Sequence, residues 1–222
     1  MLYRNNDSKT SEKGFSLIEL LIAMTVTLVV AGLASTLLTA SLNMRTRENA
    51  RTDSIADVQR ALNIMAREIA IGGYGFDNNS NGLVVGDSDE ASIRVRSNLN
   101  RYSDNSTTTT ELSEDIKYFI DTSEGRNFLV RYDKNATAGT NASVLANRLD
   151  SLDITYWSAA NIELDVVTDP SQVANAAGLT ITVTANLPAV GIQGSPGHQP
   201  ATPIRLSSDV ALRNKQENLA SY

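Results

Sequence analysis

The chain has 222 residues, of which 41% are hydrophobic and 20% charged, and its net charge is −6. This size suits one domain with an appended segment, and the acidic balance argues against a nucleic-acid partner held through phosphate contacts. The sequence contains no cysteine and a single histidine, His198, which excludes disulfides, thiolate metal sites and multi-histidine metal centres.

The first strong feature along the chain is a run of 25 residues without a formal charge, from Leu20 to Met44. About 20 helical residues cross the ~30 Å hydrocarbon core of a bilayer, so the run predicts a membrane-inserted helix. Basic residues precede it at Arg4, Lys9 and Lys13. They predict that the leading segment stays in the cytoplasm and the rest crosses outward. The run exceeds the apolar core of a secretory signal, so we expect it to be retained.

A carboxylate stands at the start of this apolar block. Glu19 lies between Ile18 and Leu20. An ionised group in hydrocarbon costs several kcal/mol unless it is paired, which makes Glu19 a functional candidate. The alternative is that Glu19 lies at the level of the lipid headgroups and is simply solvated.

The sequence KGFSLIELL, from Lys13 to Leu21, resembles the signal of type IV prepilins, which pilins share with the pseudopilins of type II secretion. The resemblance implies that a prepilin peptidase cuts between Gly14 and Phe15 and methylates the new Phe15 amine. It implies that Glu19 pairs with the N-terminal amine of a neighbouring subunit as the helix leaves the membrane for a fibre. It also implies a fibre-packing face made by the apolar residues around this carboxylate: Leu17, Ile18, Leu20, Leu21 and Ile22.

The helical pattern continues beyond the membrane run. An apolar stripe with spacings of three and four follows at Ile55, Val58, Leu62, Met65 and Ile69. Charged residues such as Arg67 and Glu68 are expected to occupy the other faces of the helix. The glycines of the segment 72–75 are expected to end it. We therefore divide the chain into a leader peptide (1–14), a transmembrane and fibre-core helix (15–44), its amphipathic continuation (45–74) and a β-rich head (75–222).

Beyond residue 75 the pattern changes to alternating and β-branched residues, which are typical of antiparallel strands. The expected strands are Leu83–Val85, Ser92–Arg96, Ile116–Ile120, Phe128–Tyr132, Ser151–Trp157, Glu163–Val167, Leu179–Thr184 and Pro203–Arg213. Polar runs rich in Asn, Ser, Thr and Gly, such as 103–110 and 136–143, are expected to be loops. The predicted fold class is α+β, a pilin fold in which the C-terminal half of the long helix packs on an antiparallel sheet.

Two segments have weak functional signals. Asp77, Asn79 and Asn81 match the first half of a calcium-binding loop, but the twelfth position is Ser88 instead of a bidentate glutamate. An Asn-rich turn is the favoured interpretation, with calcium as the weaker alternative and no other cofactor expected. The glycine-rich segment 191–198 lacks the helix and lysine of a phosphate-binding loop, so we interpret it as a mobile connection.

Among pilin-like proteins, the segments 66–75 and 209–214 are most similar to those of PilW-type minor pilins, with GspJ-type pseudopilins close behind. The resemblance implies a protein that helps to initiate type IV pilus assembly near the tip, with other pilins, minor pilins, prepilin peptidase and the inner-membrane assembly platform as partners. It implies a location in the inner membrane with the head in the periplasm, and then in the extracellular fibre. The alternatives are a type II secretion pseudopilin and a tip adhesin or other binding module. The sequence offers no credible catalytic cluster, so we do not expect an enzyme.

Overall fold

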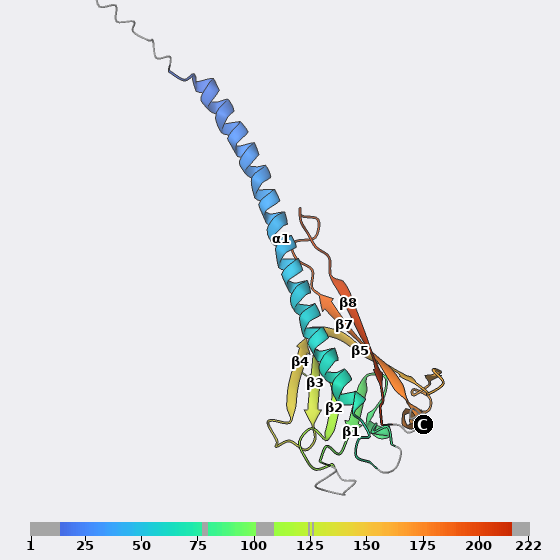
Figure 1. Cartoon of the computed structure of the whole chain (residues 1–222). Coiled ribbons are helices and arrows are strands. Elements are labelled where there is room, and N and C mark those ends of the chain that lie inside the picture. Colours follow the sequence, from blue (N-terminus) through green and yellow to red (C-terminus); the bar gives the residue numbers. More distant parts are fainter. Residues whose placement is uncertain (1–13, 77–79, 101–108, 124, 126, 215–222) are drawn as a thin grey trace, which may run out of the picture.

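The computed structural model describes residues 14–76, 80–100, 109–123, 125 and 127–214. A single helix, α1 (Leu17–Ala70), runs through 54 residues, which corresponds to a rod of about 81 Å. Figure 1 shows its first half projecting beyond the head and its second half lying against the strands. The predicted long helix and its packing on a β-rich head are therefore confirmed.

In the described residues the head contains two antiparallel four-stranded sheets, whereas the sequence pattern predicted one. The first has the order β1-β2-β3-β4, and the second has the order β6-β5-β7-β8. The strands of the first sheet are β1 (Ser92–Arg96), β2 (Asp115–Asp121), β3 (Phe128–Asp133) and β4 (Ala142–Asn147). Those of the second are β5 (Leu149–Trp157), β6 (Glu163–Leu164), β7 (Gly178–Leu187) and β8 (Thr202–Ala211). The described part of the head also has the short 3₁₀ helices η1 (Val85–Asp87) and η2 (Pro170–Asn175).

One hydrophobic core joins the helix to both sheets. The predicted stripe supplies Val58, Leu62, Met65 and Ile69, each at most 5% exposed. Inward-facing residues of the strands complete the cluster, because alternate side chains of a strand point to the same face. The contacts of α1 with strands are made mainly with β4 of the first sheet and with β7 and β8 of the second. The helix therefore lies across the place where the two sheets meet.

The end of α1 requires glycine for steric reasons. Gly73 has a φ of +76°, and a Cβ atom there would lie 2.1 Å from the carbonyl oxygen of Ser80. Its N–H donates to the carbonyl of Arg96 at 2.9 Å, which ties the turn to β1. The predicted helix end at these glycines is confirmed.

Three β segments differ from the sequence-based expectation. Leu83 forms only an isolated bridge with Val95, and the residues after it form η1. The strand expected over Glu163–Val167 is reduced to the two residues of β6. β4 lies where no strand was expected, because its mostly exposed sequence ASVLAN lacks a clear alternation of apolar and polar residues. It forms by pairing with β3 at the edge of the first sheet.

Candidate functional site

The residues at the predicted cleavage position are exposed and lie in a non-helical segment directly before α1. A Cβ added at Gly14 would meet no atom within 4 Å. The Phe15 side chain is 84% exposed. Ser16, which precedes the first helical residue, has an extended conformation with φ −74° and ψ 143°. An extended backbone without covering side chains is the form in which a peptidase can reach a peptide bond.

Glu19 lies in the first turn of α1, where the unpaired N–H groups and the helix dipole favour a negative charge. It is exposed, and no ion pair joins it to any of the described residues. Its surroundings are the exposed apolar side chains of Leu17, Ile18, Leu20, Leu21 and Ile22. The carboxylate therefore stands on an apolar surface without a cationic partner from the described part of its own chain.

The first half of α1 presents apolar side chains around its whole circumference. Its most apolar stretch has no buried residue, and the helix is long and apolar enough to cross a bilayer. Several of its hydroxyl groups are satisfied within the helix: Thr25, Thr27 and Ser35 each donate to a backbone carbonyl three or four residues earlier at 2.8 Å. The surface exposed by this segment therefore suits lipid or other apolar helices rather than water.

Comparison with known proteins identifies the same segment. The family pattern described as the prokaryotic N-terminal methylation motif matches residues 9–35. The chain is a type IV pilin-like or pseudopilin-like protein. Proteins of this kind are structural rather than catalytic, and the exposed apolar helix agrees with a place in the inner membrane or in a fibre. No curated protein and no solved structure matches the chain significantly.

A partly buried ionic cluster joins the helix to the first sheet of this pilin-like protein. Glu68 of α1 accepts a hydrogen bond from Arg131 Nε of β3 at 2.9 Å. Both side chains are less than 20% exposed. Glu68 also accepts from the hydroxyl of Tyr118 on β2, and Arg131 Nη2 donates to Ser113 Oγ at 3.0 Å. Glu68, which the sequence places beside the apolar stripe and not in it, thus contacts the first sheet through partners 50 and 63 residues further along the chain.

Burial raises the pKa of the Tyr118 phenol well above its ordinary value of 10.0, and the negative charge of Glu68 acts in the same direction. A neutral phenol can donate its hydrogen to the carboxylate, whereas a phenolate would repel it. The cluster therefore depends on Tyr118 keeping its proton.

A second charged residue of the helix fastens the second sheet. Arg47 is only 8% exposed, and its guanidinium donates to the carbonyl oxygens of Leu187 at 3.3 Å and Pro188 at 2.5 Å. In the sequence, Arg47 looks only like a charge beside the membrane run. The signal that identifies its role is tertiary, since the end of β7 lies 140 residues further along the chain.

Arg213 and Asn214, the last residues that the structure describes, form hydrogen bonds with the C-terminal end of α1. Asn214 Nδ2 donates to the carbonyl oxygens of Ile71 and Gly72 at 3.1 and 3.0 Å, and the N–H of Arg213 donates to the carbonyl of Ala70. These carbonyls follow the last helical turn, where intrahelical partners are missing. The Arg-Asn pair at the end of the segment 209–214 therefore caps the helix end.

The structure describes only one of the three calcium candidates. Asp77 and Asn79 lie outside the described residues. Asn81 is buried, its Nδ2 donates to the carbonyls of Val173 and Ala176, and its Oδ1 accepts from the N–H of Leu83. The Asn81 amide thus has a structural role between the loop and η2. Among the described residues, no group of three or more His, Asp or Glu side chains is placed to hold a metal ion.

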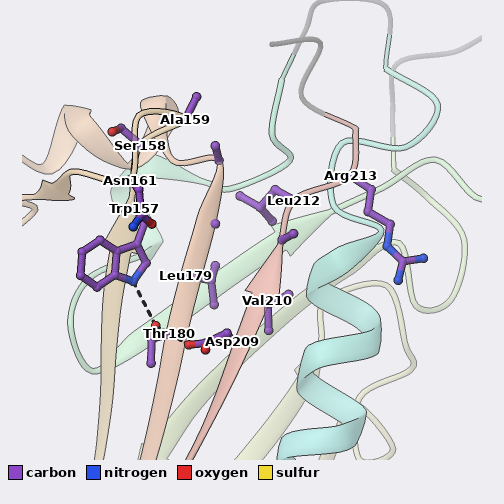
Figure 2. A pocket seen from close by; sticks show the side chains of 13 residues that line it. Trp157, Ser158, Ala159, Asn161, Leu179, Thr180, Asp209, Val210, Leu212 and Arg213 are labelled. Atoms are coloured by element: carbon purple, nitrogen blue, oxygen red, sulfur yellow. Dashed lines mark hydrogen bonds between the residues drawn. The ribbon is translucent and has the colours of Figure 1, made fainter. Parts of the chain in front are cut away.

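A shallow hollow of about 880 Å³ lies at the far end of the second sheet (Figure 2). Trp157, the last residue of β5, is half-buried and lines this hollow. Its Nε1 donates to Thr180 Oγ1 at 3.0 Å, which in turn donates to Asp209 Oδ1 at 2.7 Å. Gly178 lies opposite both Trp157 and Ala211 in the strand register, so the sheet carries little side-chain bulk there.

Proposed function

We propose that the chain is a minor pilin of a type IV pilus, processed by prepilin peptidase between Gly14 and Phe15 and methylated at the Phe15 amine. The single observation that carries the proposal is the N-terminal methylation motif at the start of a helix whose first half is apolar and exposed. The free space beside Gly14 and the extended conformation of Ser16 support the position of the cut.

In this proposal the segment 1–14 is a cytoplasmic leader, and the segment 15–44 anchors the protein in the inner membrane. The segment 45–74 continues the helix into the head, and residues 75–222 form the head on the periplasmic side. Assembly then transfers the apolar helix from lipid to a bundle of pilin helices at the inner-membrane platform. Helices leave lipid for such a bundle by close packing, and the exposed face around Leu17, Ile18, Leu20, Leu21 and Ile22 provides the surface.

Glu19 is the assembly charge in this mechanism. Processing creates an ammonium group at Phe15, and the Glu19 carboxylate of one subunit would neutralise the ammonium group of its neighbour. Each charge is costly in an apolar bundle, and removal of one partner of a buried pair costs ~3–5 kcal/mol. The pairing therefore favours subunits that sit in register.

Glu19→Ala tests this role, with Glu48→Ala as the matched control on the exposed part of the same helix. We expect both variants to be cleaved, and Glu19→Ala to be lost from sheared fibres while Glu48→Ala is incorporated normally. Normal amounts of Glu19→Ala in fibres would contradict the pairing.

The finer assignment is a PilW-type minor pilin that helps to start assembly at or near the fibre tip. Its support is the similarity of the segments 66–75 and 209–214, together with the hydrogen bonds by which Asn214 of the second segment caps the helix end in the first. The nearest alternative is a GspJ-type pseudopilin of type II secretion. Cross-linking in the membrane followed by identification of partners distinguishes the two, because pilus machinery supports the first and secretion machinery the second.

A second candidate function is that of a binding module at the fibre tip, and the Trp157 hollow is the observation that favours it. An aromatic ring beside a carboxylate and hydroxyl groups suits a carbohydrate. The apolar face of a sugar can stack on the ring, and the sugar hydroxyls can bond to the polar groups. A glycan-binding screen with the full chain and with Trp157→Ala tests this candidate. Unchanged binding in the variant, or no binding by either protein, would remove the support.

A further inference from the structure

The connection between β7 and β8 extends along the helix towards its exposed half. Val190 and Gln199 form a β-bridge beyond the regular strands, which prolongs the hairpin past Leu187. Two glycines of this extension pack against α1. A Cβ at Gly191 would lie 2.7 Å from Asn43 Nδ2, and a Cβ at Gly197 would lie 2.4 Å from Ala40 Cα. Figure 1 shows this connection running beside the helix. The segment that the sequence predicted to be a mobile connection thus packs against the helix at both of its ends.

The contact at Ala40 falls inside the charge-free run that ends at Met44. From Leu17 to Ala40 the helix rises by about 35 Å, compared with ~30 Å for the hydrocarbon core of a bilayer. When α1 spans the membrane, Ala40 therefore lies near the outer boundary of the hydrocarbon. The tip of the hairpin is held at that level.

The chemistry of the hairpin differs from that of the rest of the head. Residues 75–222 contain 18 acidic and 11 basic side chains, yet no Asp, Glu, Lys or Arg occurs between Asp169 and Arg205. At the tip, Ile192 is 79% exposed. The N–H and the hydroxyl of Ser195 both donate to the Ile192 carbonyl, so the turn satisfies polar groups internally. The free-energy cost of moving an uncharged turn with an exposed isoleucine into a lipid surface is small.

The hairpin is also fixed relative to the helix. Arg47 donates to the carbonyls of Leu187 and Pro188 about two helical turns beyond Ala40, and the close contact of Gly197 holds the other side of the loop. The depth of the tip is thus set by the same helix that crosses the membrane.

We propose that the tip of the β7–β8 hairpin, residues 191–196, rests on the periplasmic surface of the phospholipid membrane and inserts Ile192 among the lipids. This inference rests on the proposed membrane insertion of α1. It assigns the tip a role as a depth stop that sets how far the helix protrudes before a subunit is extracted into a fibre.

The absence of native cysteine allows a direct test with single-cysteine variants of the full chain. An environment-sensitive fluorophore is attached at Ile192→Cys, and the protein is reconstituted into vesicles of phosphatidylethanolamine and phosphatidylglycerol. Val29→Cys, in the middle of the exposed apolar segment, reports whether the helix is inserted. Ile162→Cys is the matched control, because Ile162 is 63% exposed and follows β5 at the end of the second sheet opposite to Arg47.

We expect blue-shifted emission at positions 29 and 192 and quenching of both by a nitroxide carried on the lipid acyl chain, with neither effect at position 162. Quenching at position 29 without quenching at 192 would overturn the inference and leave the membrane helix intact. Protection of position 192 only in assembled fibres would assign the tip to a neighbouring subunit and would also overturn it. No quenching at position 29 would contradict the proposed membrane insertion itself.

Discussion

The ionic cluster between the helix and the first sheet leads to a quantitative prediction. In Arg131→Met, Glu68 keeps the hydroxyl of Tyr118 as a partner but loses its counter-charge in a site where both side chains are less than one-fifth exposed. Removal of one partner costs ~3–5 kcal/mol for a fully buried pair and ~0–1 kcal/mol for a surface pair. This cluster lies between these limits, so we expect a loss of about 2–3 kcal/mol. For a chain of this size the loss corresponds to a fall of about 5–10 °C in Tm.

The control and the second variant make this prediction specific. Asp57 and Arg60 form an ion pair at 2.7 Å on the same helix, but the Arg60 side chain is 68% exposed, so Arg60→Met should cost less than ~0.5 kcal/mol. Glu68→Gln keeps an acceptor for Tyr118 without leaving a charge. The double variant with Arg131→Met should therefore be within ~1 kcal/mol of the native protein.

The assay is thermal and denaturant unfolding of the full chain in detergent micelles, followed by circular dichroism. If Arg131→Met costs no more than Arg60→Met, or if the double variant is no more stable than Arg131→Met alone, the cluster does not couple the helix to the sheet.

Three further outcomes are expected. Because the pKa of Tyr118 is raised in the folded protein, the unfolded chain loses this proton at a lower pH, so the free energy of unfolding should fall as the pH rises above about 10. Tyr118→Phe should make this fall less steep, by an amount that corresponds to at most one proton. An unchanged slope of unfolding free energy against pH would contradict the assignment. Gly197→Ala should displace the hairpin tip and abolish quenching of a label at position 192, because the new Cβ would overlap Ala40. Gly194 has a similar φ, but a Cβ there would meet no atom within 4 Å, so Gly194→Ala should retain the quenching. Equal quenching in the two variants would argue against the contact. Asn214→Ala removes two hydrogen bonds to the end of α1 and should lower the free energy of unfolding by about 1 kcal/mol. Amide hydrogen exchange should become faster only in the last helical turn. Unchanged exchange there would refute the capping role.

The helix and most strands were predictable because their signals are local. The apolar run from Leu20 and the stripe ending at Ile69 have helical spacing, and β1 forms over the predicted residues because its alternate positions are buried. β4 was not predictable, because it is an exposed edge strand that owes its conformation to pairing with β3. The division of the strands into two sheets likewise depends on pairing between distant segments.

The residues of the candidate site also differ in whether local sequence signals predict their roles. Gly14, Phe15 and Glu19 occur together in one continuous motif, so their candidate roles follow from the sequence alone. Arg47 and Glu68 look like ordinary surface charges in the sequence, and only the fold places the carbonyls of β7 or the guanidinium of Arg131 beside them. The packing of the glycine-rich hairpin on the helix is also invisible in the sequence, because glycine favours a flexible loop and a close contact equally.

The central claim is that the chain is cut after Gly14 and polymerises through its exposed N-terminal helix. Intact-mass and N-terminal analysis of the protein from sheared fibres and from membranes, with and without prepilin peptidase, tests this claim most directly. The account predicts a chain in the fibres that begins at an N-methylated Phe15, and a full-length chain held in the membrane when the peptidase is absent. A chain that still begins at Met1 in cells with active peptidase and never enters fibres would contradict it.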